Sequence, residues 1–176
     1  MIAARNPGFT HCPRCGAPGL HQPEPNACKC DACGFFYHLN PAVGVGGIVQ
    51  DACGHVILLK RAHDPCKGML GLPGGVVDAG ETAEAALRRE LQEEIGLEVL
   101  EMAYLGSWPN QYPYRGVMYD VLDLFFACRT NSFATATAKS ETTGLCIFAP
   151  ADIPLDQIAF SSVRQALETF CLRLED

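Results

Sequence analysis

The sequence predicts an α/β fold, in which a mixed sheet carries helices on its faces and follows a small metal-bound module. Three observations lead to this prediction. Two Cys-x-x-Cys turns lie near the start of the chain, and its 176 residues are enough to bury an apolar core. Apolar runs of strand length are interspersed with amphipathic helical segments, without a strict βαβ repeat. We place the boundary after Pro41, between a module over residues 1–41 and a main domain over residues 42–176.

Four cysteines of the module have the spacing of a zinc ribbon. Cys12 and Cys15 form the first turn and Cys30 and Cys33 the second, with 14 residues between the turns and a glycine after each. Four thiolates can enclose one Zn²⁺ in a closed tetrahedral site, which is structural and not catalytic. Disulfides or free thiols are the alternative, and Cys28 could substitute as a ligand. Because this Pro- and Gly-rich segment has little core, zinc would supply much of its folding energy.

The charge pattern argues against a nucleic-acid partner. The chain carries 13 Lys and Arg against 20 Asp and Glu, a net charge of −7, so no overall field attracts a polyanion. Residues 1–41 contain only three basic side chains. No apolar run approaches the roughly 20 residues that span a bilayer, and residues 1–9 lack the apolar core of a secretion signal. We therefore expect a cytoplasmic protein without a membrane partner.

One helix of the main domain has clear local start and stop signals. Thr82 is a good N-cap residue, and Gly96 is a natural residue to follow the last turn. Between them, Leu87, Leu91 and Ile95 recur every four residues and form the stripe that should be buried. The sequence therefore predicts an amphipathic helix packed against the sheet.

The other elements of the main domain follow from apolar runs and turn residues. A second helix is expected over residues 161–174, and long loops are expected over residues 61–80 and 108–116. The strands are expected over residues 42–50, 55–60, 99–106, 117–128 and 145–148.

Three carboxylates on the first helix suggest a divalent metal site. Glu90, Glu93 and Glu94 have i, i+3, i+4 spacing and occupy one arc of the helix. Their mutual repulsion is unfavourable unless a cation is bound, and hard oxygen ligands on a rigid helix suit Mg²⁺ or Mn²⁺. The alternative is an acidic face that is simply solvated.

The sequence around these carboxylates resembles the Nudix hydrolase family. The run from Gly75 to Leu97 matches every fixed position of the Nudix box, G-x5-E-x7-R-E-U-x-E-E-x-G-U, in which U is a bulky aliphatic residue. The resemblance implies an α/β/α sandwich around a mixed sheet over residues 42–176. It also implies hydrolysis of a nucleoside diphosphate linked to another moiety, by metal-assisted attack of water on phosphorus.

The resemblance also implies residue roles. Glu90, Glu93 and Glu94 correspond to the metal-binding carboxylates, with Glu90 or a nearby Glu as candidate base. The backbone carbonyl of Gly74 corresponds to a further ligand of Mg²⁺ or Mn²⁺.

Three more charged residues are assigned in the same way. Arg89 resembles the residue that orients the carboxylates, and Glu81 resembles a mainly structural acid. Glu141 lies where many members carry another acid that binds metal or serves as base. The alternative for Glu141 is an exposed loop acid.

The loop after the box bears on the substrate. A zinc ribbon before a Nudix domain resembles the NADH pyrophosphatase branch, whose signature S-Q-P-W-P-F-P-x-S is matched only in part by the run SWPNQYPYR from Ser107 to Arg115. Trp108, Tyr112 and Tyr114 could stack on an adenine or nicotinamide ring, and Arg115 could meet a phosphate. Alternatively, these rings pack on the sheet. We expect a small nucleotide substrate such as NADH or ADP-ribose.

Two other functions stay open at this point. A Nudix domain could serve as a nucleic-acid-binding or ligand-sensing regulator, or the chain could remove a nucleotide cap from RNA. The complete box favours preserved chemistry over a sensor. The ribbon could equally stabilise or dimerise the protein, and the resemblance implies a homodimer.

Overall fold

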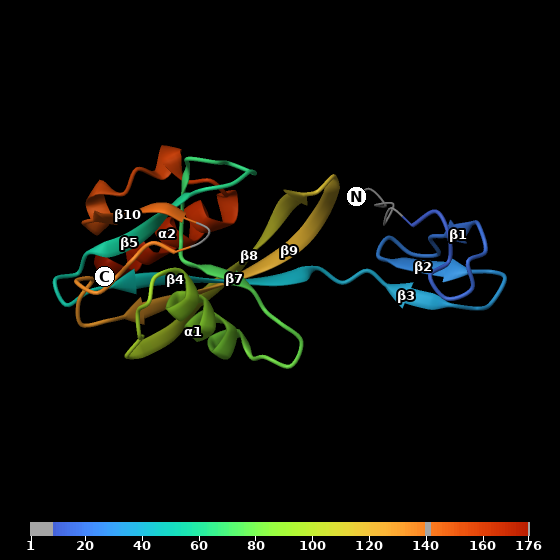
Figure 1. Ribbon diagram of the computed structural model, residues 1–176, viewed down its shortest axis with the longest axis horizontal. Helices are drawn as coiled ribbons and strands as arrows, with labels where there is room; N and C mark the ends of the chain where they lie inside the picture. The colour runs from blue at the N-terminus through green and yellow to red at the C-terminus, as the bar shows by residue number, and fades with distance from the viewer. Residues whose placement is uncertain (1–8, 140–141, 176) are drawn as a thin grey trace. The chain divides into compact units, whose positions relative to one another are not determined.

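The computed structural model describes residues 9–139 and 142–175 of the chain. It contains two compact units, Met1–Pro41 and Ala42–Asp176, each of which is described by itself (Figure 1).

The first unit has a small antiparallel sheet in the order β1-β2-β3. Its strands are β1 (Leu20–His21), β2 (Ala27–Cys30) and β3 (Phe36–His38). The buried apolar side chains of its described part are small, namely Cys12, Ala27, Cys28 and Cys30. A core of this size contributes little hydrophobic stabilisation, so the unit depends on something besides apolar burial.

The second unit is built on a seven-stranded mixed sheet in the order β10-β5-β4-β9-β8, with β6 paired to β5 and β7 paired to β4. β4 and β9 are parallel, and the other pairs are antiparallel. The strands are β4 (Ala42–Gln50), β5 (Val56–Arg61), β6 (Leu70–Gly71), β7 (Gly74–Val76), β8 (Glu101–Tyr114), β9 (Val117–Arg129) and β10 (Thr142–Phe148).

Two helices cover opposite faces of this sheet, α1 (Ala83–Glu94) and α2 (Ser161–Glu175) (Figure 1). On one face, side chains of α1 pack with alternate residues of β4, and on the other face side chains of α2 pack with the residues between them. Two short 3-10 turns, Pro150–Asp152 and Leu155–Gln157, precede α2. The expected α/β/α sandwich is confirmed. No helix in the described ranges is long and apolar enough to cross a membrane.

Helix α1 begins and ends where the local signals predict. The hydroxyl of Thr82 accepts a hydrogen bond from the backbone N–H of Ala85 at 3.2 Å. Leu87 and Leu91 are fully buried, and each contributes about 2 kcal/mol of hydrophobic stabilisation. Gly96 follows the helix with a φ of +68°, in the left-handed region that glycine adopts without strain.

The prediction of a loop over residues 108–116 is wrong. β8 and β9 form one continuous hairpin, whose paired residues extend to Tyr114 and Val117. Its two-residue turn uses positive φ at Arg115 and at Gly116, which matches the twist of the strands. Prolines within β8 suggested a break, but β8 is an edge strand, where a missing N–H is tolerated.

The expected loop over residues 61–80 also needs correction. It contains β6 and β7, two short strands that join the sheet. β7 pairs with β4 through Gly46 with Gly74 and Val45 with Gly75. This pairing fixes the glycine-rich turn of residues 71–75, which leads from β6 into β7 and precedes α1 in the chain.

Candidate active site and metal centres

The glycine-rich turn lies directly against the carboxylates of α1. The backbone N–H of Gly74 donates to Glu94 Oε2 at 2.8 Å. A Cβ atom on Gly75 would collide with the carboxylate of Glu90, and one on Gly74 would collide with the carbonyl oxygen of Val45. Gly74 has a φ of +148°, which side chains disfavour. Gly75 therefore lets the backbone lie close to α1, and Gly74 lets it lie close to β4.

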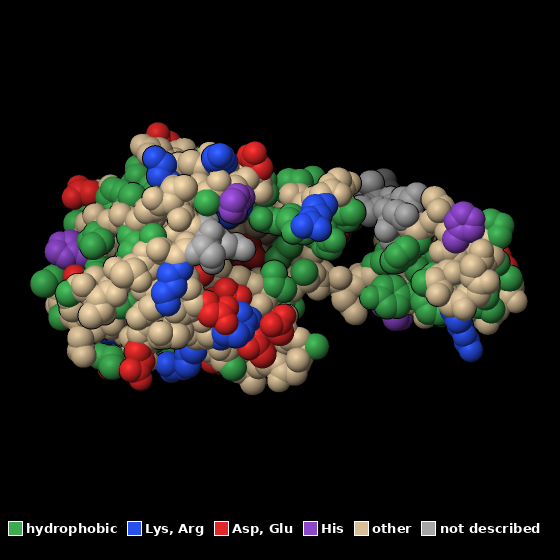
Figure 2. Space-filling model, in the orientation of Figure 1, with side chains coloured by type: hydrophobic (Ala, Val, Ile, Leu, Met, Phe, Trp, Pro, Cys, Tyr) green, Lys and Arg blue, Asp and Glu red, His purple; other side chains and the backbone are tan. Residues whose placement is uncertain are grey.

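Arg89 links the carboxylates of this region. Its guanidinium makes two hydrogen bonds to Glu81, of 2.9 and 3.0 Å, and one of 2.8 Å to Glu90 Oε1. A longer contact of 3.3 Å joins it to Glu93, and another of 3.2 Å joins it to the carbonyl oxygen of Val76. Figure 2 shows acidic side chains gathered closely around basic ones on one face of this unit.

The contacts between Arg89 and Glu81 shift the pKa values of both side chains. The hydrogen bond from Arg89 is the main cause that lowers the pKa of the Glu81 carboxyl, and the N–H of Asp78 adds to it. The same bond is the main cause that raises the pKa of Arg89, and the bond to Glu90 adds to it. Glu81 is therefore ionised and held in place at neutral pH.

The donor set fits a hard divalent cation. Among the described residues, the oxygens of Glu90, Glu93 and Glu94 do not all lie within 4.8 Å of one another. Arg89 bonds the first two, and the backbone N–H of Gly74 bonds the third. Mg²⁺ keeps several of its waters, so it does not require every carboxylate to converge. The chemistry of these carboxylates therefore suits Mg²⁺ or Mn²⁺, with water completing the coordination.

Glu141, assigned as a further acid, lies outside the described residues. Lys139 is anchored to α1: its backbone N–H donates to the Glu94 carbonyl oxygen at 3.1 Å, and its Nζ donates to the Gln92 carbonyl oxygen at 3.0 Å. This places Lys139 at the C-terminal end of α1, where a positive charge is favourable.

The residues assigned to substrate binding fall into two groups. The ring of Trp108 is half-buried and packs against Phe125, with 5.8 Å between ring centroids. Tyr112 and Tyr114 lie near each other at 6.3 Å, and the Arg115 guanidinium lies over the Tyr114 ring at 5.3 Å. The tyrosines and the arginine thus share the outer part of the hairpin, whereas Trp108 belongs to the apolar packing.

Sequence reasoning missed a polar cluster on the face that α2 covers. Asp123 Oδ2 accepts hydrogen bonds from the Ser162 hydroxyl at 2.6 Å and from the Asn110 amide at 2.9 Å. Burial raises the pKa of Asp123, and these two hydrogen bonds oppose that effect. The one available signal was an aspartate within the apolar run of residues 121–128.

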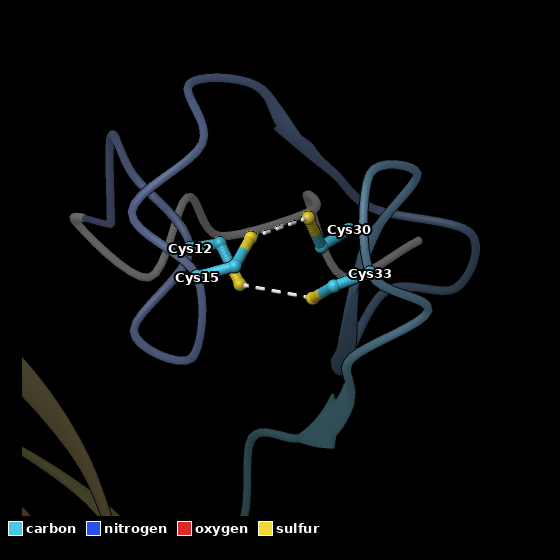
Figure 3. Close-up of side chains that lie close together, drawn as sticks. All are labelled: Cys12, Cys15, Cys30 and Cys33. Carbon is cyan, nitrogen blue, oxygen red and sulfur yellow. Dashed lines mark hydrogen bonds between the residues drawn. The ribbon is translucent and has the colours of Figure 1, made fainter.

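The four cysteines of the first unit converge on one point (Figure 3). Their Sγ atoms all lie within 4.8 Å of one another, with 3.7 Å between Cys12 and Cys33 and 3.8 Å between Cys15 and Cys30. A tetrahedron with Zn–S bonds of about 2.3 Å has edges of about 3.8 Å, so the geometry fits zinc. None of the four is in a disulfide, and Cys28 is not part of the cluster.

The pKa values of two thiols in this cluster shift in opposite directions. The pKa of Cys15 rises to about 12: backbone hydrogen bonding to Ala17 opposes the rise, whereas contacts with the other three thiols of the cluster, together with burial, cause it. Burial raises the pKa of the Cys12 thiol, but hydrogen bonds from the backbone N–H groups of Cys15 and Arg14 outweigh it and lower the pKa to about 7. A thiol with a lowered pKa more readily becomes the thiolate that binds zinc.

Another group of possible ligands lies in the turn between β4 and β5, where Asp51, Cys53 and His55 come together. Asp51 Oδ1 accepts the backbone N–H groups of Cys53 and His55, both at 2.9 Å. These hydrogen bonds account for the turn without a metal.

The fold and this site define the class of the protein. The NUDIX domain model matches residues 40–169. The chain therefore belongs to the Nudix family, which confirms the resemblance drawn from the Gly75–Leu97 motif.

Two curated relatives point to particular members of this family. The chain is 42% identical to an ADP-ribose pyrophosphatase of Methanocaldococcus jannaschii over 81 residues, which are 45% of this chain and 47% of that protein. It is 35% identical to a NAD-capped RNA hydrolase NudC of Haemophilus influenzae over 105 residues, which are 58% of this chain and 39% of that protein. The chain thus matches less than half the length of each of these relatives.

Solved structures agree on the fold. A NUDIX hydrolase from Nitrosomonas europaea superposes with a TM-score of 0.72 and 23% identity, over 95% of this chain and 93% of that one. A MutT NUDIX hydrolase from Burkholderia pseudomallei superposes with a TM-score of 0.63 and 28% identity, over 74% of this chain and 98% of that one.

Proposed function

We propose that the chain hydrolyses the pyrophosphate bond of a nucleoside diphosphate linked to another moiety, with ADP-ribose or NADH as the substrate class. The arrangement that carries this proposal is the glycine-rich turn bonded to Glu94 beside the carboxylates that Arg89 binds. The relatives named ADP-ribose pyrophosphatase and NAD-capped RNA hydrolase support the substrate class.

The chain's own residues have distinct parts in this reaction. Glu90, Glu93, Glu94 and the Gly74 carbonyl would hold Mg²⁺ or Mn²⁺, which when bound activates water and neutralises phosphoryl charge. Arg89 keeps Glu90 and Glu93 oriented through its hydrogen bonds. Glu90 or Glu141 is the candidate base that removes a proton from the attacking water.

We also propose that residues 1–41 are a zinc-ribbon module and residues 42–176 the catalytic domain. The compact units divide the chain at the same place, and the spacing of the four Sγ atoms suits Zn²⁺. Tyr112, Tyr114 and Arg115 are the proposed substrate contacts on the hairpin, and Trp108 is a weaker candidate because it packs against Phe125. A cytoplasmic location and a homodimer stay predictions.

A product assay tests the proposed function. The chain is incubated with Mg²⁺ or Mn²⁺ and ADP-ribose, NADH or a nucleoside triphosphate, and AMP release is measured. Glu94→Gln should lower kcat at least about 100-fold, because it removes a metal-binding charge while keeping the side chain's shape. Glu84→Gln, an exposed residue in the first turn of the same helix, is the matched control. Wild-type activity in the Glu94→Gln variant would contradict the proposal.

A second candidate function is removal of a nicotinamide-adenine cap from RNA. The similarity to the NAD-capped RNA hydrolase of Haemophilus influenzae favours it. Hydrolysis of the capped RNA should then release nicotinamide mononucleotide and leave a 5′-monophosphate on the RNA, whereas uncapped RNA of the same sequence should release no nicotinamide mononucleotide. RNA affinity should fall with salt.

A further inference from the structure

A half-buried carboxylate on the α2 face of the sheet, that of Asp123, is not among the residues assigned so far to metal or substrate. Among the described residues, two side chains donate hydrogen bonds to the carboxylate of Asp123. Both bonds end on Oδ2, from the Ser162 hydroxyl at 2.6 Å and from the Asn110 amide at 2.9 Å. The Asn110 amide is itself fixed, because its Oδ1 accepts the backbone N–H of Gln111 at 2.8 Å. These bonds orient the carboxylate and leave Oδ1 as its second acceptor atom.

The position of Oδ1 is set by a glycine of the central strand. Asp123 pairs with Gly44 across β4 and β9, and a Cβ atom on Gly44 would collide with Asp123 Oδ1. Gly44 lies two residues, about 7 Å, from Gly46 along β4, and Gly46 pairs with Gly74. Along β4, the acceptor atom therefore lies two residues from the position that pairs with Gly74 in the turn beside the metal-binding carboxylates.

A surface suited to a flat ring adjoins this acceptor. The Arg61 guanidinium lies over the Phe160 ring at 5.0 Å and donates to the Tyr112 hydroxyl at 3.4 Å. The rings of Tyr112 and Phe160 are 5.6 Å apart, and all three side chains are only half-buried. Tyr112 follows Asn110 by two residues on β8, and Phe160, which directly precedes α2, is two residues before Ser162. Two of the three side chains of this surface are therefore close in sequence to residues that bind the Asp123 carboxylate.

We propose that Asp123 Oδ1 accepts a hydrogen bond from an exocyclic –NH₂ group on the substrate's ring, which stacks beside Tyr112, Phe160 and Arg61. This inference rests on the proposed function and deepens it. The ligand class is a nucleotide with an amino or carboxamide donor, as in adenine or nicotinamide. A ring with a carbonyl oxygen at that position loses the hydrogen bond and faces a carboxylate.

Paired substrates test this proposal. Replacing ADP-ribose with its hypoxanthine analogue exchanges –NH₂ for a carbonyl oxygen, and replacing NAD⁺ with its nicotinic acid analogue exchanges –NH₂ for a carboxylate oxygen. We expect kcat/KM to fall about 10- to 100-fold for one of these exchanges, which identifies the ring that Asp123 binds. Equal kcat/KM for both members of both pairs overturns the proposal.

Equilibrium binding of the same analogues separates this inference from the proposed function. If the chain turns over no substrate, the proposed function fails. A 10- to 100-fold difference in Kd within one pair still supports the acceptor role of Asp123, whereas equal affinity, or binding of neither member, overturns it.

An isosteric variant inverts the expected preference. Asp123→Asn can keep an oxygen toward Ser162 and Asn110 and present –NH₂ at the Oδ1 position, so it should favour the hypoxanthine or nicotinic acid analogue. Asp156→Asn, which makes the same charge change at an exposed site, should keep the wild-type preference. Ser162→Ala should lower Tm without inverting the preference. An Asp123→Asn variant that melts like wild type and keeps the wild-type preference overturns the proposal.

Discussion

Adding one methyl group at Gly75 should separate catalysis from folding. A Cβ atom there would stand 2.7 Å from Glu90 Oε2 and nearer still to two other atoms of the carboxylate, whereas ordinary contacts begin at 3.4 Å. The carboxylate must therefore move by at least about 0.7 Å. The movement weakens its 2.8 Å hydrogen bond with Arg89. A shift of this size at a metal-binding group should lower kcat about 10- to 100-fold.

The effect on stability should be much smaller. The Glu90 side chain is 16% exposed, so it can turn toward solvent, and we expect a loss of about 1 kcal/mol, or about 2 to 4 °C in Tm. Gly71→Ala is the matched control, because its Cβ would have no atom within 4 Å. The assay is kcat at saturating Mg²⁺ together with thermal melting. Wild-type kcat in Gly75→Ala, or an equal loss in Gly71→Ala, would refute the reasoning.

Two other changes probe the zinc cluster and the arginine network. Cys12→Ser should release zinc and unfold residues 9–41, while residues 42–176 keep their melting transition. Metal analysis together with calorimetry checks this prediction. Full retention of zinc by the variant would count against Cys12 as a ligand. Glu81→Gln should lower Tm at pH 7, because the lowered pKa of Glu81 stabilises the fold above its ordinary value of 4.5. The difference from wild type should shrink as pH falls below that value and vanish once pH has passed the lowered pKa of the folded state. A gap that persisted undiminished at pH 2 would contradict the assigned cause.

Local signals were sufficient for the helix that carries the carboxylates. The side chain of Thr82 and the backbone freedom of Gly96 act on their immediate neighbours, so both ends of α1 could be predicted from the sequence. The cysteine cluster was predictable for the same reason, since each Cys-x-x-Cys turn is a local structure and only the closure of two turns is long-range.

The hairpin and the Asp123 cluster depend on long-range pairing. Prolines 109 and 113 are compatible with β8 only because it is an edge strand, and the sequence of the strand does not reveal its position in the sheet. Asp123 meets Asn110 and Ser162 from β8 and α2, through the register of the sheet and the docking of the helix. No spacing along the chain encodes these contacts.

Side chains alternate between the two faces along β4 and β7, so the α1 carboxylates and Asp123 lie on opposite sides of this pair of strands. Gly75 faces the α1 carboxylates, whereas Gly44 faces Asp123 on the α2 side. If the first side performs hydrolysis and the second selects the ring, each can vary without disturbing the other. Substitutions on β9 could then change which nucleotide is accepted while the hydrolytic machinery stays intact, so substrate range can diverge faster than chemistry among proteins with this architecture.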